Sequence, residues 1–126
     1  METLLAVGDV EGHVTLFDFV KKKIRAFGRP HVQSVVGLFI TNNDINNNSS
    51  SSEDNSAQRV FSLSQDRKLA VLSCHVSSKQ LTETRGIVLR EHVTTCCFEN
   101  ESTLHVGAVD GSVVTYRIDL VAPIQV

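Results

Sequence analysis

The sequence lacks the features that define several large protein classes. Its 126 residues carry 12 Lys and Arg against 14 Asp and Glu, a net charge of −2, which excludes a basic nucleic-acid-binding arm or an acidic tail. No stretch approaches the ~20 apolar residues that cross a bilayer. The first residues include an acid and no basic leader, so we expect no secretory signal peptide. The composition predicts one soluble domain with no membrane partner.

Cysteines and chemical motifs are also sparse. The three cysteines, with Cys96 and Cys97 adjacent, do not make a disulfide framework and suit a reducing compartment, so we expect an intracellular protein, cytoplasmic or nuclear. The five histidines show no metal-ligand spacing. The sequence contains no nucleophile elbow, phosphate-binding loop or dinucleotide fingerprint. We therefore predict a protein that is not an enzyme, with no catalytic residue, metal site or cofactor.

Short β-rich runs separated by turn residues fill most of the chain. An acid-Gly pair separates residues 4–7 from 14–17 (Glu11-Gly12) and residues 104–106 from 113–116 (Asp110-Gly111). Such pairs favour hairpins because a tight turn needs a positive φ, which glycine adopts without a steric penalty. A third pair of runs, 60–63 and 69–72, flanks a turn that contains Asp66. Three similar hairpins are predicted.

One register aligns all three hairpins. The turn acids Glu11, Asp66 and Asp110 recur after 55 and then 44 residues, and the same offsets align the strands that follow. The first spacing contains a polar Asn/Ser-rich tract, residues 41–58. Without about a dozen of these residues, both spacings approach the ~40–45 residues of a four-stranded propeller blade. The pattern predicts an internal repeat.

Residues 4–18, 60–73 and 104–117 resemble the second and third strands of WD40 repeats, with the Asp-Gly-type turn between them. Where the family usually has Trp-Asp, this chain has Phe17-Asp18, Leu72-Ser73 and Tyr116-Arg117, so its repeats are degenerate. The resemblance implies an all-β fold, a WD40-type β-propeller segment of about two and a half to three four-stranded blades. An unrelated all-β meander is the alternative.

The same resemblance implies a structural histidine. Residues 35–40 match a first strand, and His31 precedes it at the family's position, where the imidazole pairs with the turn acid of its own blade, here Asp66. His92 lies about three residues too close to the corresponding strand of the last repeat. A pair between His92 and Asp110 is therefore in doubt.

On this template residues 1–126 form a partial propeller domain, and residues 41–58 form a disordered loop inserted in the second blade, between its first two strands. Polar low-complexity sequence cannot bury enough apolar surface to offset its ordering entropy. A closed propeller typically has four to eight blades. Either the chain is a fragment of a longer protein or truncated gene model, which we favour, or its missing blades come from copies of itself or another subunit.

The resemblance also implies a function. We expect a non-catalytic protein-protein interaction scaffold within a multiprotein complex, with other proteins as partners. The family's binding loops correspond to a rim that includes Asp9, Arg29, Arg67 and Asp110. The alternatives are a ribosome-biogenesis WD-repeat factor close to RNA, and a substrate-receptor subunit of a ubiquitin ligase.

A basic cluster admits two interpretations. Lys21, Lys22, Lys23, Arg25 and Arg29 place five positive charges within nine residues. They could bind RNA, an acidic peptide or a phospholipid head group. The cluster lacks interleaved aromatic residues for base stacking, which favours a solvated outer strand whose lysines oppose edge pairing.

Overall fold

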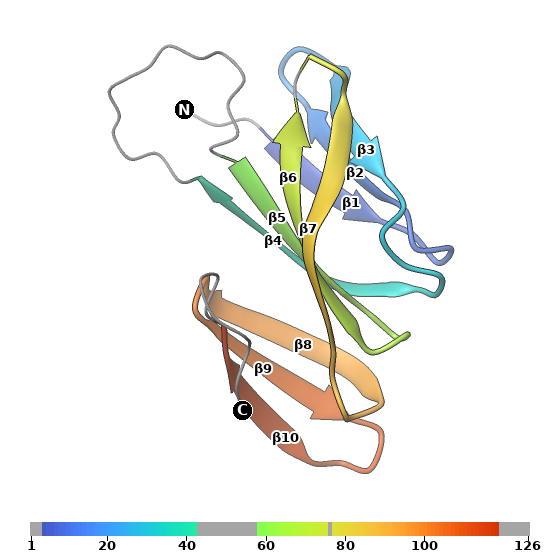
Figure 1. Ribbon diagram of the computed structural model, residues 1–126, viewed down its shortest axis with the longest axis vertical. Helices are drawn as coiled ribbons and strands as arrows, with labels where there is room; N and C mark the ends of the chain where they lie inside the picture. The colour runs from blue at the N-terminus through green and yellow to red at the C-terminus, as the bar shows by residue number, and fades with distance from the viewer. Residues whose placement is uncertain (1–3, 43–57, 76, 119–126) are drawn as a thin grey trace.

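The protein is built from β-strands. The computed structural model describes residues 4–42, 58–75 and 77–118, and this described part forms ten strands and no helix (Figure 1). The strands are β1 (Leu4–Gly8), β2 (Val14–Asp18), β3 (Lys23–Gly28), β4 (Val35–Asn42), β5 (Gln58–Ser64), β6 (Lys68–His75), β7 (Gln80–Val88), β8 (Val93–Asn100), β9 (Thr103–Ala108) and β10 (Val113–Arg117).

These strands form three antiparallel blades. Blade 1 is β1–β3, blade 2 is β4–β7 and blade 3 is β8–β10, each with strands paired in chain order. The outer strands of blades 1 and 2 also meet through one parallel pair, Phe27 and Gln80. The predicted all-β propeller segment is confirmed. Blade 2 has four strands. Among the described residues, blade 1 has no strand equivalent to β4, and blade 3 has none equivalent to β7.

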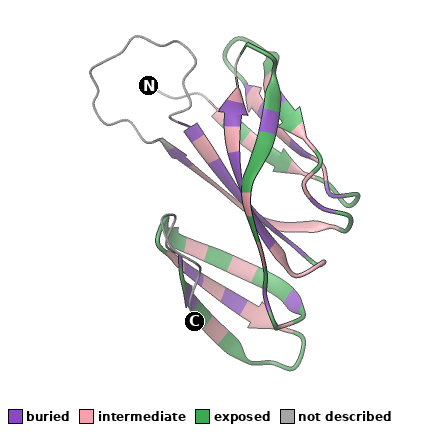
Figure 2. Ribbon diagram, viewed as in Figure 1, coloured by how far each residue is buried: buried purple, intermediate pink, exposed green. Residues whose placement is uncertain are grey.

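The blades are held together by two apolar layers, one between each successive pair. Val14 and Leu16 of blade 1 pack with Val60 and Leu72 of blade 2 in the first layer. Residues of β5 and β6 alternate between the two layers, since Phe61 belongs to the second layer and Val60 to the first. Blade 2 is therefore buried on both faces, as Figure 2 shows in β5 and β6. A strand buried on both faces needs a continuous apolar run, which residues 60–63 provide.

The second layer contains a group of three aromatic rings. Phe39 stacks on Phe98 with ring centroids 5.5 Å apart, and Phe61 meets both rings edge-on. Strands β4 and β8 lie so close together here that a Cβ at Gly37 would overlap the sulfur of Cys96. Burial, and then the neighbouring Cys97, raises the pKa of Cys96 to about 11. Cys96 therefore acts as a small apolar side chain.

The boundaries of the Asn/Ser-rich segment need correction. Residues 41 and 42 belong to β4 and residue 58 to β5, and the backbone of Thr41 pairs with that of Arg59. Thr41 is β-branched and buried, so it extends the strand instead of beginning a loop. Residues 43–57 lie outside the described residues, and the interpretation of that segment as disordered stays a prediction.

Candidate functional site

Three turns of one geometry lie along one side of the molecule, at the right in Figure 1. They join β1 to β2, β5 to β6 and β9 to β10. In each turn the backbone N–H of one residue donates to the carbonyl three positions earlier: Gly12 to Asp9 (3.3 Å), Arg67 to Ser64 (3.0 Å) and Gly111 to Ala108 (3.0 Å). The three donor residues have φ of 94°, 71° and 91°. The register predicted from sequence therefore brings equivalent backbone conformations together.

The turn carboxylates do not all act as their alignment suggests. Oδ1 of Asp66 accepts a hydrogen bond from Lys68 N, and Oδ1 of Asp110 accepts one from Ser112 N, both at 2.9 Å. In the first turn this role belongs to Asp9, whose Oδ1 accepts from the backbone N–H of both Glu11 and His13 at 2.9 Å. An Asp side chain is short enough to reach the N–H two residues on, which favours Asp9 over Glu11.

The connection between blades 1 and 2, residues 29–34, contains a buried polar group. Nε2 of His31 is hydrogen-bonded to Oγ of Ser62 at 2.8 Å, and Nδ1 lies 3.3 Å from Oδ1 of Asp66. Nδ1 makes no aligned hydrogen bond, so its contact with the carboxylate is electrostatic. Oδ2 of Asp66 accepts from Val32 N at 3.1 Å. The structure therefore brings His31 and Asp66 together and adds Ser62, which sequence reasoning missed.

Burial controls the charge of this histidine. Desolvation lowers the pKa of His31, and the opposing attraction of Asp66 does not cancel it. The imidazole is therefore neutral at neutral pH. The carboxylate beside Nδ1 favours the tautomer protonated there, so that Ser62 donates its hydroxyl proton to Nε2.

The connection between blades 2 and 3, residues 89–92, has different side chains on the same backbone plan. The N–H of His31 donates to the Gly12 carbonyl at 3.3 Å, and the N–H of Leu89 donates to the Arg67 carbonyl at 2.7 Å. Leu89 thus occupies the place of His31, and it is buried in the apolar layer together with Val106, the residue aligned with Ser62. His92 is exposed one residue before β8.

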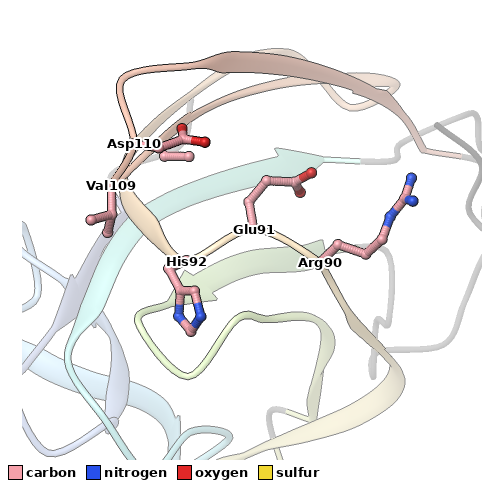
Figure 3. Close-up of a pocket in the computed structure, with 6 residues that line it drawn as sticks. Arg90, Glu91, His92, Val109 and Asp110 are labelled. Atoms are coloured by element: carbon pink, nitrogen blue, oxygen red, sulfur yellow. The ribbon is translucent and has the colours of Figure 1, made fainter.

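A shallow cavity of about 340 Å³ lies at this second connection. Glu91, one of the residues that line it, accepts a hydrogen bond at Oε1 from the hydroxyl of Tyr116. Burial, and then this bond, raises the pKa of Tyr116 to about 12. Figure 3 shows the His92 ring and the Glu91 side chain leaving the chain on opposite sides. The cavity is lined by Arg90, Glu91, His92, Ala108, Val109 and Asp110.

We define the rim as residues 9–12, 29–32, 65–67, 90–92 and 109–110. Two of its arginines are hydrogen-bonded to neighbouring backbone: Nε of Arg29 donates to the Glu11 carbonyl at 2.9 Å, and Nη1 of Arg67 donates to the Arg90 carbonyl at 3.3 Å. Each bond joins a turn to the adjacent connection. These arginines therefore fix the shape of the rim as well as its charge.

The structure divides the basic cluster, because Arg29 lies on the rim while the lysines lie at the opposite end of the blades. Lys21, Lys22 and Lys23 are exposed at the turn between β2 and β3. Oδ1 of Asp18 accepts from the N–H groups of Val20 and Lys21, which shapes this turn. Arg25 is partly buried, and its Nε donates to Oε1 of Gln58 at 3.2 Å. At this end of the blades, the exposed part of the cluster therefore consists of the three lysines without Arg25.

No group of three His, Cys, Asp or Glu side chains in the described residues could hold a metal ion. Within those residues, no helix is long and apolar enough to cross a membrane.

Comparison with known proteins identifies the fold. No family model and no curated protein matches the chain. The β-propeller domain of Myceliophteria thermophila Cps50 (Swd1) aligns with a TM-score of 0.62 at 16% identity, over 92% of this chain and 31% of that one. The computationally designed proteins Ika4 and Ika8 align at TM-scores of 0.57 and 0.56, both at 18% identity over 94% of this chain, and over 62% and 31% of their own. The chain has a β-propeller fold and spans about a third of the Swd1 chain.

Proposed function

We propose that this chain is a WD40-type propeller segment that acts as a protein-interaction scaffold, with the rim as its binding surface. The observation that carries this proposal is the exposure of apolar side chains on a rigid rim. Val10, Val32 and Val109 are among the most exposed large apolar residues described, and all three lie on the rim. Apolar residues surrounded by charges are typical of protein interfaces.

Both positively and negatively charged side chains lie on the rim with these valines. Arg29 and Arg90 are exposed beside Asp9, Glu11 and Asp110. Hydrogen bonds donated by the hydroxyl and the backbone N–H of Ser112 lower the pKa of Asp110, so this carboxylate is ionised well below neutral pH. Mixed charge around apolar contacts favours recognition of a protein surface over binding to the uniform charge of nucleic acid.

Paired variants test the rim. The rim variant carries three substitutions, Val10→Asp, Val32→Asp and Val109→Asp. The tagged endogenous protein is purified as wild type and as this variant, and mass spectrometry compares the proteins recovered with each. We expect the rim variant to lose its partners by about tenfold or more, which corresponds to about 1.4 kcal/mol. Val20→Asp is the control, because Val20 is also a strongly exposed valine and lies in the turn between β2 and β3, at the other end of the blades.

Equal recovery of partners by the rim variant and the Val20→Asp control would contradict the proposal.

The basic cluster supplies a second test in the same experiment. Replacing Lys21, Lys22 and Lys23 by Glu leaves protein partners bound if the rim is the interface. Loss of a salt-sensitive RNA from this triple variant would instead favour the RNA-associated alternative.

A further inference from the structure

The cavity at the second connection has an equivalent place in blade 2. In blade 2 the backbone N–H of Gln65, in the turn, donates to the carbonyl of Ser34, in the connection, at 2.9 Å. In blade 3 the N–H of Val109 donates to the His92 carbonyl at the same distance. These equivalent bonds align the cavity lining with residues of blade 2, which are 32–34 and 64–66.

Side chains close this place in blade 2 and leave it open in blade 3. Ser64 is buried, and its hydroxyl donates to the carbonyl of Gln33 at 3.1 Å. Oδ2 of Asp66 accepts from the N–H of Val32 at 3.1 Å. Blade 3 has Ala108 in the place of Ser64, and neither link from turn to connection is present among its described residues. The space between turn and connection is the cavity of about 340 Å³.

One end of the cavity is negatively charged. Oδ1 of Asp110 accepts from the hydroxyl and the N–H of Ser112, at 2.6 and 2.9 Å, while its Oδ2 makes no hydrogen bond with any other described residue. Glu91 contributes a second carboxylate, which the hydroxyl of Tyr116 binds at Oε1. Figure 3 shows the guanidinium of Arg90 at the opposite end of the lining from Asp110. The end at Asp110 therefore offers a charged acceptor oxygen.

The rest of that end is apolar and small. Val109 is strongly exposed and Ala108 is half-buried. The cavity volume of about 340 Å³ lies at the lower limit of the ~300–1,000 Å³ of ligand pockets, which suits a single long side chain. Lys and Arg lay an apolar stem along apolar surface and end in a charged donor. Such a donor makes a stronger hydrogen bond to a carboxylate than a neutral donor does.

We infer that this cavity binds one basic side chain, lysine or arginine, of the protein that docks on the rim. The stem of that side chain lies along Ala108 and Val109, and its charged head donates to Oδ2 of Asp110. Glu91 adds a second negative charge to the same cavity. This inference rests on the proposed function and adds the chemistry of one partner residue to it.

Photo-cross-linking identifies what occupies the cavity. A photoreactive phenylalanine analogue replaces Arg90 in the endogenous full-length protein, a position that leaves the Asp110 end of the lining intact. In a parallel sample the analogue replaces Val10, which lies on the rim away from the cavity. Mass spectrometry identifies the partner residue that is cross-linked at each position. We expect a lysine or arginine next to the residue cross-linked to position 90.

Asp110→Asn tests the charge against the partner so identified. Asparagine keeps an oxygen that accepts from Ser112, so the turn is retained while the negative charge is lost. We expect affinity for the purified partner to fall about tenfold. Asp9→Asn is the matched control, because Asp9 is the exposed aspartate of the first turn and its two carboxylate oxygens lie 3.2 and 3.0 Å from Nδ1 of His13.

The partner supplies the complementary variant. Replacing its basic residue by methionine keeps a long apolar side chain and removes the charge, and we expect a similar loss of affinity. Because both changes remove one interaction, combining the methionine variant with Asp110→Asn should cost little more than either change alone.

Four results would overturn the inference. They are a cross-link from position 10 with none from position 90, a cross-linked segment at position 90 without a basic residue, equal affinity of Asp110→Asn and Asp9→Asn, and losses that add fully in the combined variants. Each leaves the rim as the binding surface, because the position 10 cross-link and the rim variant report on it separately. If neither position gives a cross-link and the rim variant keeps its partners, the proposed function is wrong and the inference fails with it.

Discussion

The two connections between successive blades have the same backbone plan and opposite side-chain chemistry. Into blade 2, a neutral His31 lies between Ser62 and Asp66. Into blade 3, the aligned residues are Leu89 and Val106, both buried in an apolar layer. The backbone hydrogen bonds that hold each connection to the preceding turn are the same. The blade junction is therefore defined by backbone geometry, and its side chains need only be mutually compatible.

Side chains are compatible when both residues of a pair are polar, as His31 and Ser62 are, or both are apolar, as Leu89 and Val106 are. A buried polar atom without a partner costs free energy, whereas a polar pair and an apolar pair are both acceptable. In blade 3 the polar link moves elsewhere, to the hydrogen bond from Tyr116 to Glu91. Blades 2 and 3 thus each have a side-chain contact between the preceding connection and the strands of the blade, with a different chemistry at a different place.

Mixing the two chemistries should produce the largest effect. Leu89→His places an imidazole in the apolar layer beside Val106, which stands where blade 2 has Ser62, so Nε2 has no hydroxyl partner even though Asp110 aligns with Asp66. We expect the free energy of unfolding to fall by about 3 kcal/mol, from lost apolar contacts and an unpaired polar group. Chemical denaturation of the chain measures this. A loss below that of a surface substitution such as Thr115→Ala would contradict the comparison.

The reverse exchange should be smaller and can be rescued. His31→Leu leaves the Ser62 hydroxyl without its partner, and we expect a loss of about 2 kcal/mol. Adding Ser62→Val reproduces the pair found in blade 3, which should return stability to within about 1 kcal/mol of wild type. The same denaturation experiment tests both variants. If the double variant is less stable than His31→Leu alone, the two junction chemistries are not interchangeable.

The smallest predicted effect is a dependence of the free energy of unfolding on pH, which His31 should give to its own junction alone. Because burial lowers the pKa of His31, the unfolded chain binds more protons than the folded one as the pH falls through 6.5, and stability falls with it. Above that range the stabilisation is complete. The slope from this residue cannot exceed about 1.4 kcal/mol per pH unit.

Denaturation between pH 7 and 5 measures this slope, and the variant with His31→Leu and Ser62→Val is the control that should lack it. The carboxyls of Asp9 and Asp110 do not interfere, since their pKa values are lowered from 3.8 by hydrogen bonds from His13 and Ser112 and they act at lower pH. An equal slope in wild type and control would show that His31 is not its source.

Strand pattern and repeat spacing predicted the fold because both depend on local sequence. Alternating apolar residues and acid-Gly turns are readable without tertiary information, and they placed the three hairpins in one register. The site was less accessible. In the sequence, Ser62 is a serine in a predicted strand, and its neighbours do not indicate a special role. Only the fold places its Oγ 2.8 Å from Nε2 of His31. Leu89 shares no side-chain chemistry with His31, so only the backbone reveals that they are equivalent.

Two further differences have local causes. Arg67 adopts a positive φ that glycine has in the other two turns, so a Gly-based search finds two turns of the three. Glu11 aligns with the other turn acids, yet its longer side chain leaves the bonding to Asp9. The turn position predicts a backbone shape more reliably than it predicts the residue that stabilises it.

The turn at Gly12 affects where the chain tolerates changes in length. The N–H of Gly12 closes this turn by donating to the Asp9 carbonyl, its carbonyl accepts the N–H of His31, and a Cβ at Gly12 would overlap the His31 carbonyl. An inserted residue in this turn would therefore displace the start of the next blade. Between β4 and β5, by contrast, the sequence has residues 43–57, yet Asn42 and Gln58 still pair. We therefore expect a change in chain length to be tolerated better between β4 and β5 than in the turn that contains Gly12.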